Sequence, residues 1–430
     1  MTVLRVRAVG PLHGELKVPG DKSISHRAVM LSAVAYGVTR VRGLLFSEDV
    51  LATIAAFRAM RVKIREETEK EEVVICGRGP DELVSSHMAL DLGNSGTSMR
   101  LLAGLLAGLP VMALLIGDQS LSRRPMRRVI EPLRLMGADV GCTREGTAPI
   151  MIKGAELKGI RYRLPVASAQ LKSALLMAGL FARGETWLSE PGPSRDHTEL
   201  MLARFGVKLM RDHEWIGVRG PAKLKNASVI EVPADISSAA FLIVAALIVP
   251  GSEIVIKDVG INPTRTGILD ILKLMGADIA VENQRLMGLE PVADLRVKAG
   301  ELRAAEIGGD LLTRAIDEVP ALCIAAARAK GATVIRDAKE LRVKESDRIA
   351  AMARALAAMG AGVEEREDGL IIKGPAALKG AAVESDSDHR VAMAAAVAGL
   401  AAKGEMVING AESIMTSFPD FLRALTRLAS

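Results

Sequence analysis

The chain has 430 residues, of which 49% are hydrophobic, 25% are charged and only 3% are aromatic. This hydrophobic fraction can bury more than one core and excludes disorder of the whole chain. The scarcity of aromatic side chains argues against a protein that stacks nucleic-acid bases or builds an antibody-like surface. The net charge of +5 is small for this length, so it indicates no general polyanion binder but allows a local cationic site.

The cysteines and the apolar segments indicate a reducing, aqueous setting. Cys76, Cys142 and Cys323 lie far apart, so we expect neither a disulfide framework nor a CxxC metal site. The six histidines have no partner at ligand spacing, and we expect no metal. The N-terminus lacks a signal-peptide core. The run from Leu101 to Gly117 is short for a membrane span and predicts a buried helix followed by a buried strand. We therefore expect a cytoplasmic protein with no membrane segment.

An internal repeat runs through the whole chain. A helix of small residues followed by a glycine is expected six times, at Ser23–Tyr36, Thr97–Ala107, Ser168–Arg183, Ser237–Pro250, Asp317–Lys330 and Asp388–Lys403. The glycines are Gly37, Gly108, Gly184, Gly251, Gly331 and Gly404, at intervals of 71, 76, 67, 80 and 73 residues. Because glycine accepts a positive φ cheaply, we interpret these residues as the C-terminal stops of the helices.

A second helix recurs in the same phase. It ends in segments such as Leu135–Val140, Leu274–Ile279 and Ala358–Val363, with weaker copies at Arg204–Val207 and Ala59–Val62. The helix from Pro419 onward would be the sixth copy. Each unit is therefore predicted to contain, in order, a strand, a helix, a strand, a helix and a strand. This period is too long for the common solenoids, so we expect two compact domains of three units, divided near residues 225–235.

Polar residues gather at the expected helix starts, where free N–H groups and the helix dipole favour anions. In the segment Pro19–Arg27, Ser23 is expected to cap the helix, with Lys22 just before it and Arg27 one turn after it. This segment is not a Walker phosphate loop, because Asp21 separates Gly20 from Lys22. An ordinary capped surface helix is the alternative.

Three further segments of the first half have the same character. They are Leu92–Arg100 with two glycines, Ser120–Arg128 with four arginines, and Ser168–Ser173 together with Ser194–Thr198. One guanidinium of the arginine run would suit a carboxylate or a phosphate, although most such runs are solvated. The others offer small hydrogen-bonding groups, and a tight turn before a helix explains the glycines equally well.

The second half supplies carboxylates as well as cations. Asp317 precedes Pro320 and would serve either as a helix cap or in acid–base chemistry. Lys344 and Arg348 are expected on one helix face, where Glu345 could neutralise Arg348 or form an ion-paired surface. The segment Asp388–Arg390 repeats this pattern. If the helix starts converge, they form a cationic cleft suited to group transfer on a multiply anionic substrate. Spacing alone does not establish this convergence.

In combination, these motifs resemble those of the 5-enolpyruvylshikimate-3-phosphate synthase family over essentially the whole chain. The most specific segments are Pro19–Ser23 with Arg27, Gly93–Thr97, Arg342–Arg348 and Asp388–Arg390. The resemblance implies an α/β, two-domain enolpyruvyl transferase fold, with three βαβαββ repeats in each domain (an inside-out α/β barrel). The implied domains are residues 1–21 plus 229–430 and residues 22–228, with the active site in the cleft between them.

The resemblance also implies a reaction of the shikimate pathway, on the route to chorismate and the aromatic amino acids. The enolpyruvyl group of phosphoenolpyruvate is transferred to the 5-hydroxyl of shikimate 3-phosphate, and phosphate is released by addition–elimination through a tetrahedral intermediate. The partners would be these two small molecules, with no cofactor, no metal, no nucleic acid and no membrane. A cytoplasmic monomer is expected.

Residue roles follow from the resemblance, motif by motif. The implied catalytic residues are Lys22, Asp317 and Glu345. Shikimate 3-phosphate would be bound by Lys22, Ser23, Arg27, Ser168, Ala169, Gln170, Arg195, Asp317 and Lys344. Phosphoenolpyruvate would be bound by Lys22, Asn94, Gly96, Arg124, Gln170, Arg348 and Arg390, with His389 in a supporting role. Ala169, Glu340 and the run from Thr416 to Pro419 depart from the best-known bacterial pattern and resemble a divergent second class of the family.

Two alternatives accompany this interpretation. The sister family of UDP-N-acetylglucosamine enolpyruvyl transferases carries a cysteine in the loop corresponding to Gly117–Arg124, and this chain has none there. A non-catalytic protein that binds phosphate ligands on the same scaffold would have no need for both Asp317 and Glu345.

Overall fold

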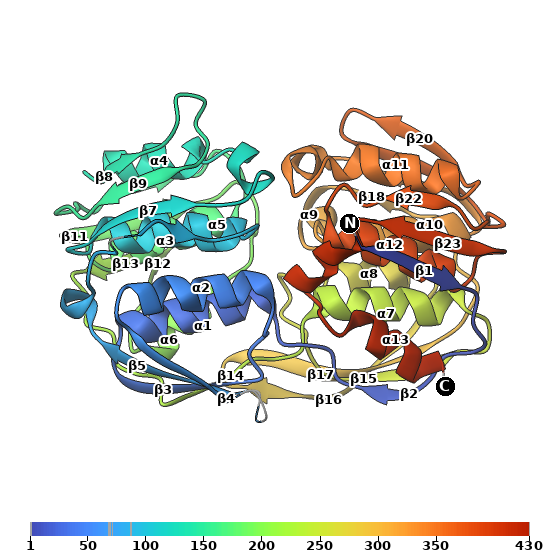
Figure 1. Cartoon of the computed structure of the whole chain (residues 1–430), viewed down its shortest axis with the longest axis horizontal. Coiled ribbons are helices and arrows are strands. Elements are labelled where there is room, and N and C mark those ends of the chain that lie inside the picture. The colour runs from blue at the N-terminus through green and yellow to red at the C-terminus, as the bar shows by residue number, and fades with distance from the viewer. Residues whose placement is uncertain (1, 68–69, 71, 87, 430) are drawn as a thin grey trace. The chain divides into compact units, whose positions relative to one another are not determined.

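The computed structural model describes residues 2–67, 70, 72–86 and 88–429 (Figure 1). The chain forms two compact units. The continuous unit is Gly20–Val232, and the split unit joins Met1–Pro19 to Pro233–Ser430. The chain passes from one unit to the other after Pro19 and again after Val232, whereas the sequence placed these crossings after residues 21 and 228. The second crossing comes later because strand β14 (Val229–Glu231) still pairs with a strand of the continuous unit.

The continuous unit contains three four-stranded sheets of one design. In each, a short strand lies parallel to a central strand, which is followed by two antiparallel strands. The first sheet has the order β14-β3-β5-β4, with β3 Tyr36–Arg42, β5 Glu72–Arg78 and β4 Lys63–Glu67. The second has the order β6-β7-β9-β8, with β6 Leu90–Asp91, β7 Met112–Ile116, β9 Ile150–Lys153 and β8 Asp139–Gly141. The third has the order β10-β11-β13-β12, with β10 Arg161–Arg163, β11 Gly184–Ser189, β13 Trp215–Gly220 and β12 Met210–Asp212.

The split unit repeats this design twice and then departs from it. One four-stranded sheet has the order β2-β15-β17-β16, with β2 His13–Leu16, β15 Glu253–Gly260, β17 Glu290–Lys298 and β16 Asp278–Met287. The next has the order β18-β19-β21-β20, with β18 Glu306–Ile307, β19 Gly331–Ile335, β21 Gly369–Gly374 and β20 Gly362–Arg366. Among the described residues the sixth sheet has three strands in the order β22-β23-β1, with β22 Ala382–Glu384, β23 Glu405–Asn409 and β1 Val3–Arg7.

Helices fill the inside of each unit and the sheets lie outside them (Figure 1). The inner helices are α1 (Lys22–Val34), α3 (Gly96–Ala107) and α5 (Ala169–Gly179) in the continuous unit, and α7 (Ile236–Ile248), α10 (Val319–Arg328) and α12 (His389–Gly399) in the split unit. Every residue of α7 is buried. The Cβ of an alanine at Gly104 of α3 would lie 2.1 Å from the carbonyl oxygen of Ala174, so glycine permits the close packing of α3 on α5.

The second helix of each repeat and several short helices complete the units. The α-helices are α2 (Glu48–Ala59), α4 (Arg127–Leu135), α6 (His197–Arg204), α8 (Gly267–Leu274), α9 (Gly309–Thr313), α11 (Arg348–Ala358) and α13 (Phe421–Ala429). The 3-10 helices are η2 (Pro80–Glu82), η3 (Leu121–Arg123), η4 (Lys339–Val343) and η5 (Ala411–Thr416). The repeated α/β architecture is confirmed, but the predicted barrel is wrong, because the described strands form six separate sheets and none of these closes. Leu101–Gly117 is confirmed as a buried helix and a strand, α3 and β7.

Our interpretation of the first set of glycines needs correction. Gly37, Gly184 and Gly331 have positive φ angles but lie inside or at the start of strands rather than at helix ends. Gly108 does follow its helix directly, with a φ of −98°. The inner helices therefore end without a left-handed glycine. After five of the six, a glycine with positive φ follows three to five residues beyond the last helical residue, where the chain turns into its central strand. In the part of the chain that the structure describes, no helix is long and apolar enough to cross a membrane.

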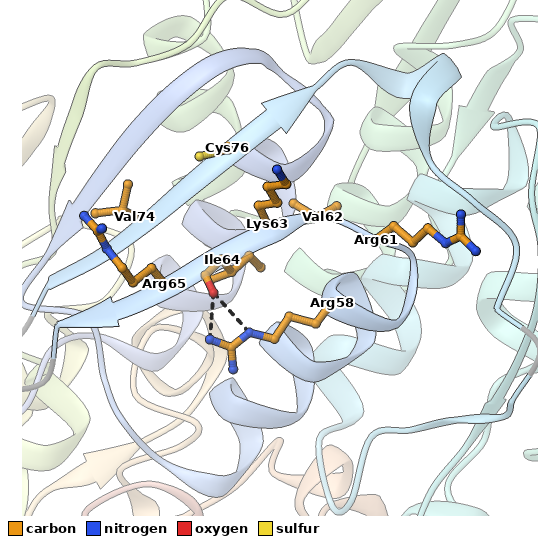
Figure 2. Close-up of a pocket in the computed structure, with 8 residues that line it drawn as sticks. All are labelled: Arg58, Arg61, Val62, Lys63, Ile64, Arg65, Val74 and Cys76. Atoms are coloured by element: carbon orange, nitrogen blue, oxygen red, sulfur yellow. Dashed lines mark hydrogen bonds between the residues drawn. The ribbon is translucent and has the colours of Figure 1, made fainter.

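The glycines of the second helices do act as stops. Gly137, Gly206, Gly276 and Gly360 follow their helices directly with φ between 78° and 92°. Arg61 takes the corresponding place after α2, with φ at 66°. Figure 2 shows Arg61 at the turn between α2 and β4, where Arg58 also donates two hydrogen bonds to the carbonyl of Ile64, at 3.2 and 2.8 Å.

This difference between the repeats predicts opposite effects of two substitutions. Arg61→Gly should stabilise the protein by about 0.5–1 kcal/mol, because a left-handed conformation is strained for a side chain bearing a Cβ. Gly360→Ala should destabilise it by about 1 kcal/mol for the same reason, since a Cβ there has only Lys379 as a neighbour, at 4.0 Å. Shifts of the urea midpoint in circular dichroism test both. Equal effects of the two substitutions would show that this conformation does not govern stability here.

Candidate active site

Side chains from the starts of the inner helices contact neighbouring helices in the continuous unit. The sequence suggested this arrangement but did not establish it. Arg27 of α1 reaches across to two other helices. It donates to Thr198 Oγ1 of α6 at 2.7 Å and to Ser173 Oγ of α5 at 2.8 Å. It also donates to the carbonyl of Ser23 at 2.9 Å, and its side chain is buried. These neutral groups fix the orientation of the guanidinium.

Lys22 is the first residue of α1, not a loop residue before the helix cap. Asp21 is the N-cap, and its side chain accepts from the amide of Ile24 at 2.8 Å. The expectation that Ser23 caps the helix is therefore wrong, because the helix begins one residue before it. Asp49 of α2 pairs with the ammonium group of Lys22 at 2.8 Å. The sequence analysis missed Asp49, which lies 27 residues away in a helix that carried no motif.

The starts of α3 and α5 are joined by the side chain of Gln170. Its amide oxygen accepts from Arg100 at 2.7 Å and its nitrogen donates to Thr97 at 2.9 Å. Ser168 caps α5 by accepting from the amide of Leu171, and Ala169 is the first helical residue. Gln170 is therefore held at the junction of two helix starts.

Arg124 is the buried member of the arginine run. Its guanidinium donates to Asn94 Oδ1 and, at 3.3 Å, to Ser120 Oγ. Asn94 is held in turn by Asp118, at 2.7 Å. A Cβ at Gly96 would lie 3.0 Å from an Arg124 nitrogen, so the absence of a side chain lets this guanidinium approach the start of α3.

The remaining predicted residue of this unit is Arg195, and a neighbouring cation, Lys172, was not in the predicted set. Arg195 lies half-buried in the loop before α6. Lys172, from the same motif as Gln170, forms buried ion pairs with Glu190 at 2.7 Å and Glu199 at 2.8 Å. Burial acts to lower the pKa of Lys172, but the charges of Glu199 and Glu190 outweigh this effect and raise it. Lys172 is thus a structural cation.

Arg348 organises the corresponding region of the split unit. Its side chain is 1% exposed and contacts Asp388 at 2.8 Å, Glu345 at 2.6 Å and Asp317 at 3.5 Å. Burial opposes its charge, but the three carboxylates raise the pKa of Arg348 well above its usual value. The predicted pairing of Glu345 with Arg348 is confirmed, and the two further partners come from segments distant in the sequence.

The positions of Asp317 and Lys344 correct two expectations. Lys344 follows η4 in extended conformation and α11 begins at Arg348, so the two cations do not share a helix face. Both nevertheless contact Asp317, which lies 3.6 Å from the nitrogen of Lys344. Asp317 does not cap α10, because Glu318 occupies the N-cap position. Its carboxylate is therefore held by cations rather than by the helix backbone.

In the split unit, Asp388, His389 and Arg390 form the start of α12. Asp388 caps the helix by accepting from the amide of Arg390 at 2.9 Å. His389 Nδ1 lies 3.2 Å from Thr416 Oγ1, so the threonine that departs from the family pattern contacts the predicted supporting histidine. Both carboxylate oxygens of Asp388 also accept from the buried guanidinium of Arg348, at 2.8 and 3.3 Å. One carboxylate thus serves as helix cap and as ion-pair partner.

A second buried group, which the sequence analysis missed, lies at the start of α10. Glu318 is fully buried and accepts a hydrogen bond from Ser237, at the start of α7. Arg265 donates to Ser237 at 2.6 Å and lies 3.6 Å from Glu318. No sequence signal links Arg265 to Glu318, because the two are 53 positions apart and Arg265 lies outside every motif found in the sequence.

These arrangements can bind anions and move protons. Each unit places guanidinium or ammonium groups where helix N-termini also favour negative charge. The split unit adds the carboxylates of Asp317 and Glu345 beside a guanidinium. Among the described residues, no group of His, Cys, Asp and Glu could hold a metal ion.

His26 of α1 lies in a buried cluster of serine and threonine hydroxyl groups. Its Nδ1 is 2.9 Å from Thr53 Oγ1 and its Nε2 is 3.4 Å from Ser95 Oγ. Burial, assisted by Lys22 and Arg27, lowers the pKa of His26 well below its usual value. His26 is therefore neutral in the folded protein, where a third cation beside Lys22 and Arg27 would be unfavourable.

This lowered pKa predicts an acid-sensitive stability. Below pH 6.5 the unfolded histidine binds a proton that the folded one does not, so stability falls as the pH falls. Between pH 7.5 and pH 5 this contribution should reach at most about 2 kcal/mol. His26→Asn should remove it in urea titrations at both pH values, whereas His13→Asn, in exposed β2, should not. An unchanged pH dependence in His26→Asn would contradict the assignment.

Comparison with known proteins finds relatives that match nearly the whole chain. The sequence profile of the family described as EPSP synthase (3-phosphoshikimate 1-carboxyvinyltransferase) matches residues 6–425. The 3-phosphoshikimate 1-carboxyvinyltransferase of Halorhodospira halophila is 56% identical, over 99% of this chain and 95% of its own length. That of Geobacter sulfurreducens is 54% identical, over 97% of both chains.

Solved structures agree with this relationship. An EPSP synthase from Acinetobacter baumannii is 47% identical, with a TM-score of 0.88 over 100% of this chain and 98% of that one. The enolpyruvyl transferase NikO of Streptomyces tendae has a TM-score of 0.79, over 99% of this chain and 97% of that one; at 18% identity it shows the shared fold alone. The family match over nearly the full length and the identities above 50% lead to one conclusion: the chain belongs to the EPSP synthase family.

Proposed function

We propose that the chain transfers the enolpyruvyl group of phosphoenolpyruvate to the 5-hydroxyl of shikimate 3-phosphate and releases phosphate. It would thereby act in the shikimate pathway toward chorismate and the aromatic amino acids. The observation that carries this proposal is the cluster of Asp317 and Glu345 around buried Arg348, in a chain of this family. A guanidinium for an anionic substrate and two carboxylates for proton transfer are what the reaction needs.

The cations of the two units would bind the two substrates. Lys22 would contact both, and Arg124, Arg348 and Arg390 would bind the carboxylate and phosphate of phosphoenolpyruvate. The further groups proposed for phosphoenolpyruvate are Asn94, Gly96 and Gln170. Those proposed for shikimate 3-phosphate are Ser23, Arg27, Ser168, Ala169, Gln170, Arg195, Asp317 and Lys344. The preset orientations of Arg27 and Arg124 support these roles, because ligand binding need not pay to order them.

Proton transfer would begin at Glu345. When an anion binds beside Arg348, Glu345 shares its cationic partner with a further negative group besides Asp317 and Asp388, which raises its affinity for a proton. Protonated Glu345 gives its proton to the methylene carbon, and the 5-hydroxyl oxygen bonds to the adjacent carbon while Asp317 takes the hydroxyl proton. Glu345 then removes a proton from the new methyl group, the carbon–oxygen bond to phosphate breaks, and the enol is restored, while the proton held by Asp317 passes to the departing phosphate.

The remaining features belong to the same proposal. The site would lie in a cleft between the two units, where closure on the substrates would exclude water from the tetrahedral intermediate. His389 would support the site through its contact with Thr416. We propose a cytoplasmic monomer that needs no metal or other cofactor, because the described cations and carboxylates include groups for each step. The sister UDP-N-acetylglucosamine reaction and a non-catalytic role are not favoured by the named relatives.

Phosphate release is the direct test of this function. Release from phosphoenolpyruvate should depend strictly on shikimate 3-phosphate, with the enolpyruvyl ether identified by mass. UDP-N-acetylglucosamine should not replace shikimate 3-phosphate. Tight binding of shikimate 3-phosphate without phosphate release would instead identify a non-catalytic binding protein.

The acid–base roles predict a separation of turnover from binding. Glu345→Gln and Asp317→Asn should each lower kcat by about 100-fold or more, because a positioned acid or base is lost. Shikimate 3-phosphate should still bind in calorimetry. Glu364→Gln, on edge strand β20 and exposed, is the matched control and should retain its turnover. Near-normal turnover in both site variants would refute the assignment.

The positions of the three cysteines predict that thiol reagents do not inhibit turnover. Cys76 and Cys142 are partly exposed, whereas burial raises the pKa of Cys323 to about 12. Maleimide should therefore label Cys76 and Cys142 in the folded protein and Cys323 only after unfolding, as measured by peptide mass spectrometry. Turnover should be unaffected by the first two modifications. Inactivation that follows the labelling of one cysteine would indicate a thiol-dependent mechanism.

A further inference from the structure

The sixth sheet differs from the other five at one edge. In the other sheets, the strand after the second helix of the repeat forms the outer edge, as β20 does after α11. In the sixth sheet the described strands end at β1, which occupies the place that β21 has in the fifth sheet. The edge of β1 that faces away from β23 therefore has no neighbouring strand among the described residues.

A groove runs along this edge. It has a volume of about 430 Å³ and is lined by residues 4–9, by Leu400 and Glu405, and by Leu422, Leu425, Thr426 and Ala429 of α13. Leu4 and Val6 pack partly against the core, and Leu422 is 43% exposed. Figure 1 shows β1 and α13 in this part of the split unit. The apolar side chains make the floor of the groove suitable for the inner face of a further strand.

The backbone of β1 is oriented for pairing on this side. The amide of Val407 donates to Ala381, toward β22, so its neighbours Met406 and Ile408 face β1. The register pairs these two with Val6 and Leu4. Because alternate residues of a strand direct their N–H and C=O groups to opposite sides, those of Arg5 and Arg7 point to the open edge.

The charge of the edge specifies the kind of segment that fits. Arg5 and Arg7 are exposed and share a single carboxylate, Glu405, at 2.6 and 3.0 Å. A second copy pairing through its own β1 would bring four arginines together against two glutamates, which is unfavourable. In the fourth sheet the edge strand supplies Glu282 to Arg296 of its neighbour at 2.9 Å, which is the pairing that Arg5 and Arg7 would accept.

We propose that the open edge of β1 binds an extended acidic peptide segment of a partner protein by β-strand addition. The segment carries apolar residues at alternate positions, directed to the groove between β1 and α13. Its intervening residues are acidic and lie opposite Arg5 and Arg7. Main-chain hydrogen bonds supply the affinity and the alternation supplies the selectivity. This docking site is separate from the residues proposed for catalysis.

Peptide binding to the full chain tests the proposal. A fluorescein-labelled peptide Gly-Ser-Val-Glu-Val-Glu-Val-Ser-Gly should bind in fluorescence anisotropy, whereas Gly-Ser-Val-Lys-Val-Lys-Val-Ser-Gly should bind about fivefold or more weakly. The acidic peptide with N-methylated amides at both glutamates should not bind, because in antiparallel pairing the residues opposite Arg5 and Arg7 donate to β1. Hydrogen exchange of residues 3–7 should slow when the acidic peptide is bound.

Matched protein variants locate the contact. The double variant Arg5→Gln and Arg7→Gln should lose the preference for the acidic peptide. Arg40→Gln with Arg42→Gln is the control, because these arginines also share one glutamate, Glu72, but lie on β3, which is paired on both edges. This control variant should keep the preference for the acidic peptide. Turnover should be unchanged in both variants, so the result does not depend on the proposed function.

Three outcomes would overturn the proposal. Equal binding of the acidic and basic peptides would remove the role of Arg5 and Arg7. Retained binding of the N-methylated peptide would exclude strand addition. A concentration-dependent dimer in sedimentation that is lost on Leu422→Lys would assign the groove to a second copy of the chain.

Discussion

Buried helix starts are the constraint on which the structure depends. The inner helices are packed among sheets and other helices, so the amides of their first turns cannot all be left to water. Capping side chains accept from these amides in five of the six inner helices: Asp21, Ser95, Ser168, Asp235 and Asp388. The helix α10 is the exception, because Glu318 occupies its N-cap position without a capping hydrogen bond and is instead engaged with Ser237.

This exception places a carboxylate where the proposed chemistry needs one. The aspartates at the starts of α1, α7 and α12 accept from helix amides, whereas Asp317 precedes a helix that it does not cap. Its contacts include two cations, Lys344 and Arg348. A carboxylate that caps no helix can exchange partners when an anionic ligand arrives, which a capping carboxylate cannot do without exposing buried amides. The same local difference separates Asp317 from Asp388, although both contact Arg348.

The sequence predicted those parts of the fold and of the candidate site that depend on neighbours along the chain. Repeated helices, the buried segment from Leu101 to Gly117 and the pair of Glu345 with Arg348 follow from spacings of a few residues. The partners of Lys22, Arg27 and Glu318 could not be predicted, because Asp49, Thr198 and Arg265 lie far from them in the chain and no local spacing signals the pairing. The cap of α1 was misplaced because Asp21 and Ser23 are both good capping residues and only the entry of the chain into the helix decides between them.

The positions of β1 and β2 affect the order in which the chain can fold during synthesis. These strands leave the ribosome before the strands they pair with: β1 pairs with β23, about 400 residues later in the chain, and β2 pairs with β15. The continuous unit has all of its strands between Gly20 and Val232, so it can fold as a domain while the split unit is still being made. The strand β1 then stays unpaired until β23 has been made. Arg5 and Arg7 keep that waiting segment charged, which opposes its association with other nascent chains.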